Sequence, residues 1–252
     1  MSNVTRRQMI TSGLAATAGV SSIAVAAHLA DQYGLLPPDC GNLYRPGEVL
    51  TFASQRLLGS RSPAREFDSS QISKPPHANG KPLASENFKK LAANGFADWR
   101  LNIDGMVSRP LSLSLSELRG YSSRSQITHL ACEEGWSFIA QWTGVPLSHI
   151  LELAGASAKA KYVFYFSIQS RWWDSVDLSD AYHPQTLVTY GMNGEDLPVG
   201  HGGPLRLRVP RQLGYKSVKY ITRLTVTDTL KGFGKGMGSS AAERGYAWYS
   251  GI

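Results

Sequence analysis

The sequence predicts a single α+β domain that is rich in strands, with mixed β-sheets, short helices and long loops. Beyond residue 86, two segments alternate apolar and polar residues with a period of two, which is typical of half-buried strands, and a third is dense in β-branched and aromatic residues. The helical segments between them are short, and no internal repeat is visible. A chain of 252 residues, 42% of them hydrophobic, is long and apolar enough for an ordinary globular core.

The first part of the chain is irregular up to residue 86 and regular beyond it. Residues 31–86 are rich in proline and glycine, and one short helix is expected around residues 50–58. The segment "NFKKLAA" predicts a helix that ends at Asn94-Gly95, because this pair is common at helix C-termini. "WRLNIDGMV" then predicts a strand, and "SLSELR" predicts one or two helical turns.

The second part alternates strands with one clear helix. "GVPLSHILELAG" predicts a helix with one apolar face that is closed by Gly155. "KYVFYFSIQ" predicts a strand buried on both faces, and a strand with a turn at Asn193-Gly194 follows. "PLRLRVP" places Arg206 and Arg208 on one side of a strand, and "VKYITRLTVTD" predicts the last one. The glycine-rich tail beyond residue 231 is expected to be flexible or to wrap an anion.

The N-terminal segment predicts export. "TRRQMITSGLAATAGVSSIAVAA" has paired Arg6 and Arg7, then about twenty uncharged residues that end near an Ala-x-Ala sequence. This pattern resembles a twin-arginine signal, so residues 1–30 are expected to direct the chain to the periplasm and to be removed. The alternative is a retained membrane anchor, which would need about twenty strongly apolar residues. Because the twin-arginine route carries folded proteins, it is often used when a cofactor is inserted in the cytoplasm.

The charge favours anionic ligands but not nucleic acid. The formal net charge is +7, from 26 basic and 19 acidic residues. No run of five or more Lys/Arg and no zinc-finger spacing is present, and the basic residues are scattered among strands and glycines. We therefore expect a small-molecule ligand and no nucleic-acid partner.

Cys132 is one of only two cysteines, and it follows an apolar strand directly before two acids, a glycine and an aromatic residue. From the residues alone, three interpretations remain open. The thiol could be a buried packing residue, which is the usual role of an isolated cysteine. It could form a disulfide with Cys40 in an exported protein. It could also be a metal ligand, since a metal deprotonates a thiol and a thiolate is a strong donor.

Three segments, taken in order and spacing, resemble the molybdopterin domain of the sulfite oxidase family. They are "DWRLNIDGMVSRPLSLSLSELR", "CEEGWSFIAQWTGVPLSHILELAG" and "HPQTLVTYGMNGEDLPVGHGGPLRLRVPRQLGYKSVKYITRLTVTD", which lie within residues 97–230. The resemblance implies a single sulfite-oxidase-type molybdopterin-binding domain and a molybdenum–molybdopterin cofactor (Mo-MPT). It makes Cys132 the metal ligand and catalytic residue, while Cys40 lies outside the match and is interpreted as a free thiol.

The resemblance also implies which residues bind the cofactor. "HGGPLR" supplies two side chains and "GYKSVK" supplies three positions, one of them through its backbone; a hydroxyl residue at the end of "YVFYFS" and the Asn of "HANG" complete the set. These candidates are His201, Arg206, Ser217, Val218, Lys219, Ser167 and Asn79. Four of them have an ordinary alternative: a solvated strand face for Arg206 and Lys219, and a plain turn for His201 and Asn79.

The acids after the ligand cysteine bear on the substrate. Sulfite oxidase has a basic pair shortly after this position, whereas this chain has Glu133 and Glu134, which would repel sulfite. The resemblance therefore favours the bacterial reductase branch and oxygen-atom transfer to or from a sulfoxide-type substrate. The alternatives are a sulfite-oxidising enzyme, a non-catalytic binding protein with the same fold, and a thiol–disulfide protein. The aromatic loop Trp172–Asp174 could shape the substrate pocket or serve in packing.

Electrons are expected from a separate redox partner, for which the reductase branch suggests a membrane haem subunit. The sequence has no Cys-x-x-Cys-His haem motif, no iron–sulfur cysteine set and no Rossmann-like glycine pattern. We divide the chain into a signal (1–30), an irregular segment that covers the cofactor (31–86), the molybdopterin-binding oxidoreductase domain (87–230) and a Gly-rich, aromatic tail (231–252). A monomer is expected, because no dimerisation domain follows.

Overall fold

The computed structural model describes residues 46–59, 62–81 and 83–252, together with the isolated positions 25, 28, 29, 35 and 37. The paired arginines of the expected export signal and Cys40 lie outside the described residues. None of the described helices is long and apolar enough to span a membrane.

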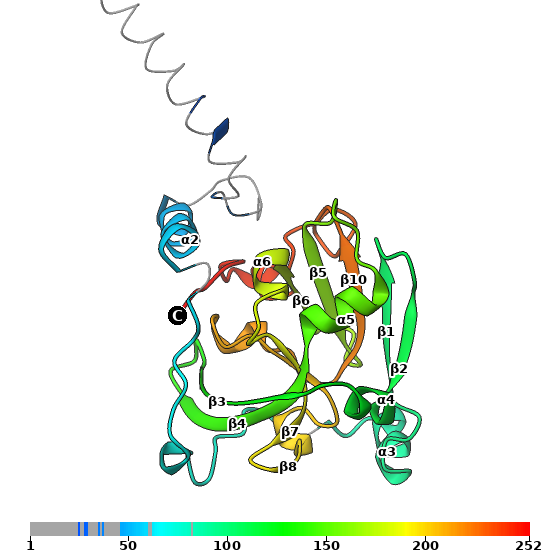
Figure 1. Cartoon of the computed structure of the whole chain (residues 1–252). Helices are drawn as coiled ribbons and strands as arrows, with labels where there is room; N and C mark the ends of the chain where they lie inside the picture. The colour runs from blue at the N-terminus through cyan, green and yellow to red at the C-terminus, as the bar shows by residue number, and fades with distance from the viewer. Residues whose placement is uncertain are drawn as a thin grey trace, which may run out of the picture.

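Two five-stranded sheets form the frame of the domain (Figure 1). In the first, the order is β2-β1-β10-β5-β6, with β1 parallel to β10 and the other neighbours antiparallel. Its strands are β1 (Arg100–Gly105), β2 (Leu111–Ser114), β5 (Tyr162–Ser167), β6 (Trp173–Asp177) and β10 (Ile221–Thr227). The second has the order β3-β4-β7-β8, with β9 paired to β7, and all its pairs are antiparallel. Its strands are β3 (Arg124–Ala131), β4 (Ser137–Pro146), β7 (Leu187–Met192), β8 (Glu195–Asp196) and β9 (Arg206–Arg208).

The helices are short, as the sequence predicts. They are α2 (Pro46–Gly59), α3 (Glu86–Ala93), α4 (Leu115–Gly120), α5 (Leu147–Ala154) and α6 (Leu178–Ala181). The helix expected from "GVPLSHILELAG" is confirmed as α5, and it ends because Gly155 adopts the left-handed conformation at φ 65°. Figure 1 shows α2 beside the C-terminal end of the chain, where the Phe52 ring meets the Tyr249 ring with centroids 5.0 Å apart.

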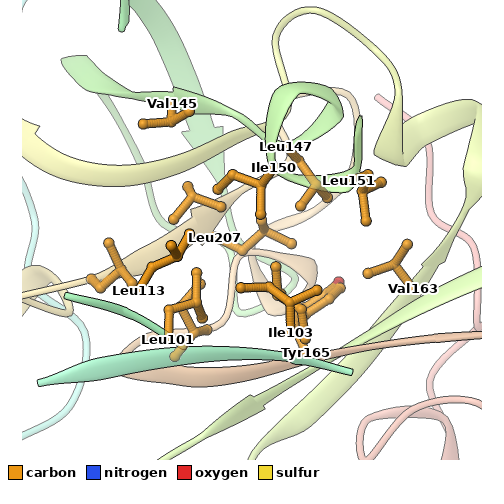
Figure 2. Packing of buried hydrophobic residues seen from close by; sticks show 14 of the residues in the cluster. Leu101, Ile103, Leu113, Val145, Leu147, Ile150, Leu151, Val163, Tyr165 and Leu207 are labelled. Carbon is orange, nitrogen blue, oxygen red and sulfur yellow. The ribbon is translucent and has the colours of Figure 1, made fainter. Parts of the chain in front are cut away.

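The main core joins the two sheets through α5. Leu147, Ile150 and Leu151 of this helix are fully buried, and Figure 2 shows them among side chains of β1, β2, β5 and β9. Burying a side chain of this size stabilises the fold by about 1.5–3 kcal/mol. The core therefore holds β9, through Leu207, against the first sheet, while β3 is held by its pairing with β4. The candidate site lies at the ends of β3 and β9.

The structure differs from expectation at two segments. The strand predicted for "PLRLRVP" forms as β9, but both of its faces are buried, because Leu207 packs into the main core on one face and Arg206 and Arg208 lie against the Trp142 ring on the other. The C-terminal tail packs rather than staying flexible. The Trp248 side chain is 1% exposed, and its indole N–H donates to Ser175 Oγ at 2.9 Å.

Candidate functional site

Cys132 lies at the tip of the β3–β4 hairpin. Its backbone N–H donates to the carbonyl of Trp136 at 2.9 Å, and the N–H of Gly135 donates to the carbonyl of Cys132 at 3.1 Å. Gly135 has φ 89°, a conformation that favours glycine, so the residue permits this tight turn. The thiol is half-buried and is not in a disulfide.

A cavity of about 490 Å³ opens at this tip and gathers most of the residues predicted from the sequence. Among the lining residues are Asn79, Cys132, His201, Arg206, Ser217, Val218 and Lys219. Ser167 does not line the cavity; its Oγ accepts a hydrogen bond from the N–H of Gln169 at 3.1 Å, and Gln169 is itself a lining residue. The structure thus brings together seven of the eight predicted positions from four separate stretches of chain.

Two glycines allow the wall at residues 198–203 to pack against its neighbours. A Cβ on Gly202, whose φ is 104°, would lie 2.8 Å from Lys219 Cγ. A Cβ on Gly203 would lie 2.0 Å from the carbonyl oxygen of Leu197. Since real Cβ atoms do not approach other atoms so closely, the "HGG" sequence is required for this wall.

Arg206 and Lys219 tie the cavity walls together through carbonyl groups. The Arg206 guanidinium donates to the carbonyls of His201 at 2.7 Å and Ser217 at 2.6 Å. The Lys219 ammonium donates to the carbonyls of Gly200 at 2.6 Å and Asn79 at 2.8 Å. These two cations therefore connect the loop at Asn79, the 198–203 wall and the 217–219 segment to one another.

These cations are not neutralised by the protein around them. In the described part of the chain, no carboxylate lies within ion-pairing distance of Arg206 or Lys219. Burial lowers the pKa of Arg206 to about 10, and burial followed by the Arg206 charge lowers the pKa of Lys219 to about 8. Burial, then the same two cations, lower the pKa of His201 to about 4, so its ring is neutral at pH 7. The wall is suited to an anionic ligand, which would supply the missing negative charge.

Two carboxylates flank the thiol on the exposed side. Glu134 accepts from the Asn79 side-chain amide at 3.0 Å and from the Trp136 indole at 2.9 Å. The Cys132 thiol donates to Glu133 at 3.2 Å. Burial is the main cause that raises the pKa of Cys132 to about 12, with the two acids adding to it. The thiol is therefore protonated in the protein alone, and a bound metal would have to displace that proton.

The side chains of the aromatic loop Trp172–Asp174 lie partly at the mouth of the cavity and partly in the protein interior. Trp172 is 39% exposed and lines the cavity, whereas Trp173 packs in the cluster of Phe164 and Leu230. Asp174 is 1% exposed and forms an ion pair of 2.6 Å with the buried ammonium of Lys216. Only Trp172 of these three can therefore meet a ligand in the cavity.

Sequence reasoning missed several lining residues. Arg171 and Tyr215 line the cavity, although Arg171 stands next to Trp172 and Tyr215 lies two positions before Ser217. Arg208 does not line it, but its guanidinium bonds to Ser217 Oγ at 3.2 Å. The alternation in "PLRLRVP" was the available signal for Arg208, because it puts Arg208 on the same side of the strand as Arg206. Within the described ranges, no three or more His, Cys, Asp or Glu residues form a group that could hold a metal ion.

Comparison with known proteins confirms the expected family and fold. The model of the oxidoreductase molybdopterin binding domain matches residues 89–232. The putative protein-methionine-sulfoxide reductase subunit YedZ1 of Azospira oryzae is 39% identical over 155 residues, which cover 62% of this chain and 56% of that protein. The protein-methionine-sulfoxide reductase catalytic subunit MsrP of Xanthomonas axonopodis pv. citri is 37% identical over 147 residues, or 52% of this chain and 46% of the relative.

A solved structure agrees with this assignment. The sulfane dehydrogenase SoxCD from Paracoccus pantotrophus superposes with a TM-score of 0.50 at 25% identity, over 53% of this chain and 39% of that one. The chain spans about half the length of the curated relatives it matches. Since the family model covers more than half of the sequence and the fold agrees, the chain belongs to the oxidoreductase molybdopterin-binding domain family.

Proposed function

We propose that this chain is an exported Mo-MPT oxidoreductase that reduces a sulfoxide-type substrate by oxygen-atom transfer, with electrons from a separate redox partner. The observation that carries the proposal is one cavity lined by the Cys132 thiol, the buried Arg206 and the partly buried Lys219, two cations for which the described residues supply no acidic partner. The names of the matched relatives, which are protein-methionine-sulfoxide reductase subunits, support the sulfoxide class.

The residues present fit the proposed cofactor. Molybdopterin carries a phosphate and polar ring edges, which need cationic donors and close backbone approach. Arg206 and Lys219 supply the cations, and the buried Nε–H of Arg206 has no partner among the described residues. Gly202 leaves no side chain between the backbone and Lys219. Cys132 supplies the soft thiolate donor, and when bound the cofactor supplies two-electron oxygen-atom transfer.

The protein's own groups would hold the cofactor in place and select the substrate. The β3–β4 turn would hold the Cys132 sulfur at a fixed place on the cavity wall, and the neutral His201 ring can donate one hydrogen bond and accept another. Glu133 and Glu134 place negative charge beside the sulfur, which opposes an anion such as sulfite and favours a neutral sulfoxide. Trp172 at the mouth offers an apolar face to the carbon chains of such a substrate.

The cellular setting belongs to the same proposal. The Arg6-Arg7 segment supports export to the periplasm by the twin-arginine route, with a retained anchor as the alternative. A membrane haem subunit would supply electrons, and the chain would act as a monomer. Residues 31–86 are proposed as the segment that covers the cofactor, which is supported by Asn79 and Lys81 in the cavity wall.

The test is a metal and cofactor analysis of the full chain, matured in a host that makes molybdopterin. Equimolar molybdenum and oxidised pterin are expected in the wild type, and Cys132→Ser should lose or alter the metal centre. With a reduced dye as electron donor, the loaded protein should turn over methionine sulfoxide. A wild type without metal and pterin would overturn the enzyme proposal and favour the non-catalytic binding protein. Oxidation of sulfite without turnover of sulfoxides would instead favour the sulfite-oxidising alternative.

A further inference from the structure

Arg208 is a fully buried cation in β9 that lies outside the cavity lining. One terminal nitrogen of its guanidinium donates to Ser217 Oγ at 3.2 Å, and the other donates to the carbonyl of His129 at 2.5 Å. In the part of the chain that the structure describes, no carboxylate pairs with Arg208, and its Nε–H has no hydrogen-bond partner. A buried arginine normally sits against an acid, as Arg56 does against Asp180 at 3.2 Å.

A second cation lies on the same ring. The guanidinium carbons of Arg206 and Arg208 each stand 5.2 Å from the centroid of the Trp142 indole. Burial, and then the Arg206 charge, lower the pKa of Arg208. Repulsion between these two buried positive charges destabilises the protein when no ligand is bound. An anion held beside Arg206 would offset the charge of both guanidinium groups.

The contacts of Arg208 join the two halves of the candidate site. His129 belongs to β3, the strand that leads into Cys132, and Ser217 belongs to the segment that carries the proposed cofactor contacts. Ser217 Oγ also accepts from the N–H of Val209 at 3.1 Å, so Arg208 bonds to a hydroxyl that is already held by the residue directly after β9. A planar guanidinium can donate in two directions at once, whereas a lysine ammonium is a point charge that cannot span both acceptors in the same way.

We propose that Arg208 is a positioning residue: it fixes the Cys132 strand against the Ser217 segment, and its uncompensated charge raises the reduction potential of the centre that Cys132 would hold. The positioning part stands on geometry alone. The charge part rests on the proposed function, because it needs a bound redox centre. A positive charge nearby stabilises the more electron-rich, reduced state, so its removal lowers the potential.

The positioning part is tested by hydrogen exchange on the apoprotein of the full chain. Arg208→Lys should speed amide exchange in residues 128–136 and 214–219, while β1 and β5 exchange as in the wild type. Arg56→Lys is the matched control, because it makes the same change at a buried site whose partners are acids on α6 and its N-cap; it should leave the two segments unchanged. Wild-type exchange in both segments of Arg208→Lys would overturn the positioning role.

The charge part is tested by redox titration of the loaded protein, followed by the molybdenum electron paramagnetic resonance signal. Arg208→Met should lower the reduction potential, whereas Arg208→Lys, which keeps the charge, should stay closer to the wild type. Equal potentials in all three proteins would overturn the charge role even if Arg208→Met is less stable. If Arg208→Met does not fold, Arg208→Gln replaces it in the same comparison. Failure of the proposed function would appear differently, as a wild type that holds no molybdenum.

Discussion

Gly202→Ala should damage the candidate site more than it damages the fold. The new methyl group would lie 2.8 Å from Cγ, 2.9 Å from Cβ and 3.1 Å from Cα of Lys219. Because two of these atoms belong to the stem and backbone rather than to the flexible end, rotation of the side chain cannot relieve the contact. The Lys219 segment must therefore move away from the 198–203 wall.

The size of the effect follows from two contributions. An alanine at φ 104° is strained by about 1–3 kcal/mol, which lowers the free energy of unfolding. A displaced Lys219 also loses its hydrogen bonds to the carbonyls of Asn79 and Gly200, and a bond from a charged donor contributes about 1.5–3 kcal/mol. If one such interaction with the cofactor is lost, its affinity falls about tenfold or more, since about 1.4 kcal/mol corresponds to tenfold.

Gly194→Ala is the control that separates backbone strain from the steric contact with Lys219. Gly194 has φ 87° in the β7–β8 turn, but a Cβ there would meet nothing within 4 Å. Both variants should unfold at lower urea concentration, and only Gly202→Ala should lose pterin and molybdenum during dialysis. The reasoning would be refuted if Gly202→Ala kept its cofactor as firmly as Gly194→Ala.

Three further predictions concern the His201 imidazole, the hydrophobic core and the mouth of the cavity. The folded protein holds the pKa of His201 at about 4, mainly by burial and then by the Arg206 charge. In the unfolded chain the His201 imidazole has its usual pKa of about 6.5, so below this pH the unfolded chain binds more protons than the folded one, and the free energy of unfolding should fall as the pH drops from about 6.5 to 4. Urea melts of His201→Gln should show a smaller fall over this range, and an identical fall would contradict the prediction. Ile150→Ala should cost about 2–5 kcal/mol in urea melts without lowering cofactor content per folded chain. Trp172→Ala should change stability by less than about 0.5 kcal/mol but raise the KM for a sulfoxide, and an unchanged KM would remove it from the substrate site.

Local patterns predicted the elements that depend on local rules. The apolar face and terminal glycine of α5 were sufficient to place that helix, because both are set by residues within a few positions of each other. The cavity residues were found by resemblance, since Cys132 and Lys219 are far apart in the sequence and no spacing rule connects them. Period-two alternation identified the two sides of β9 but not what covers them, so the burial of Arg208 was unexpected.

Long-range partners explain the remaining differences. The Asp174–Lys216 ion pair joins residues 42 positions apart, and no local pattern shows that they meet. The tail was expected to be flexible or to wrap an anion because glycines dominate its start. Gly238 is one of those that allow packing instead, since a Cβ there would lie 2.8 Å from the Trp248 indole nitrogen. Composition describes the freedom of the backbone, whereas tertiary contacts decide whether that freedom is used.

The electrostatics of the site bear on when the cofactor is inserted. Arg206, Arg208 and Lys219 are held by carbonyl and hydroxyl groups, and among the described residues no acid balances them. An anionic ligand that binds only the folded state adds stability, about 2.7 kcal/mol at a concentration one hundred times its Kd. The loaded domain should therefore melt at a higher temperature than the apoprotein, and the difference should shrink in Arg206→Met. The proposed twin-arginine route carries folded proteins and would suit such a domain, because the cofactor would be bound before export.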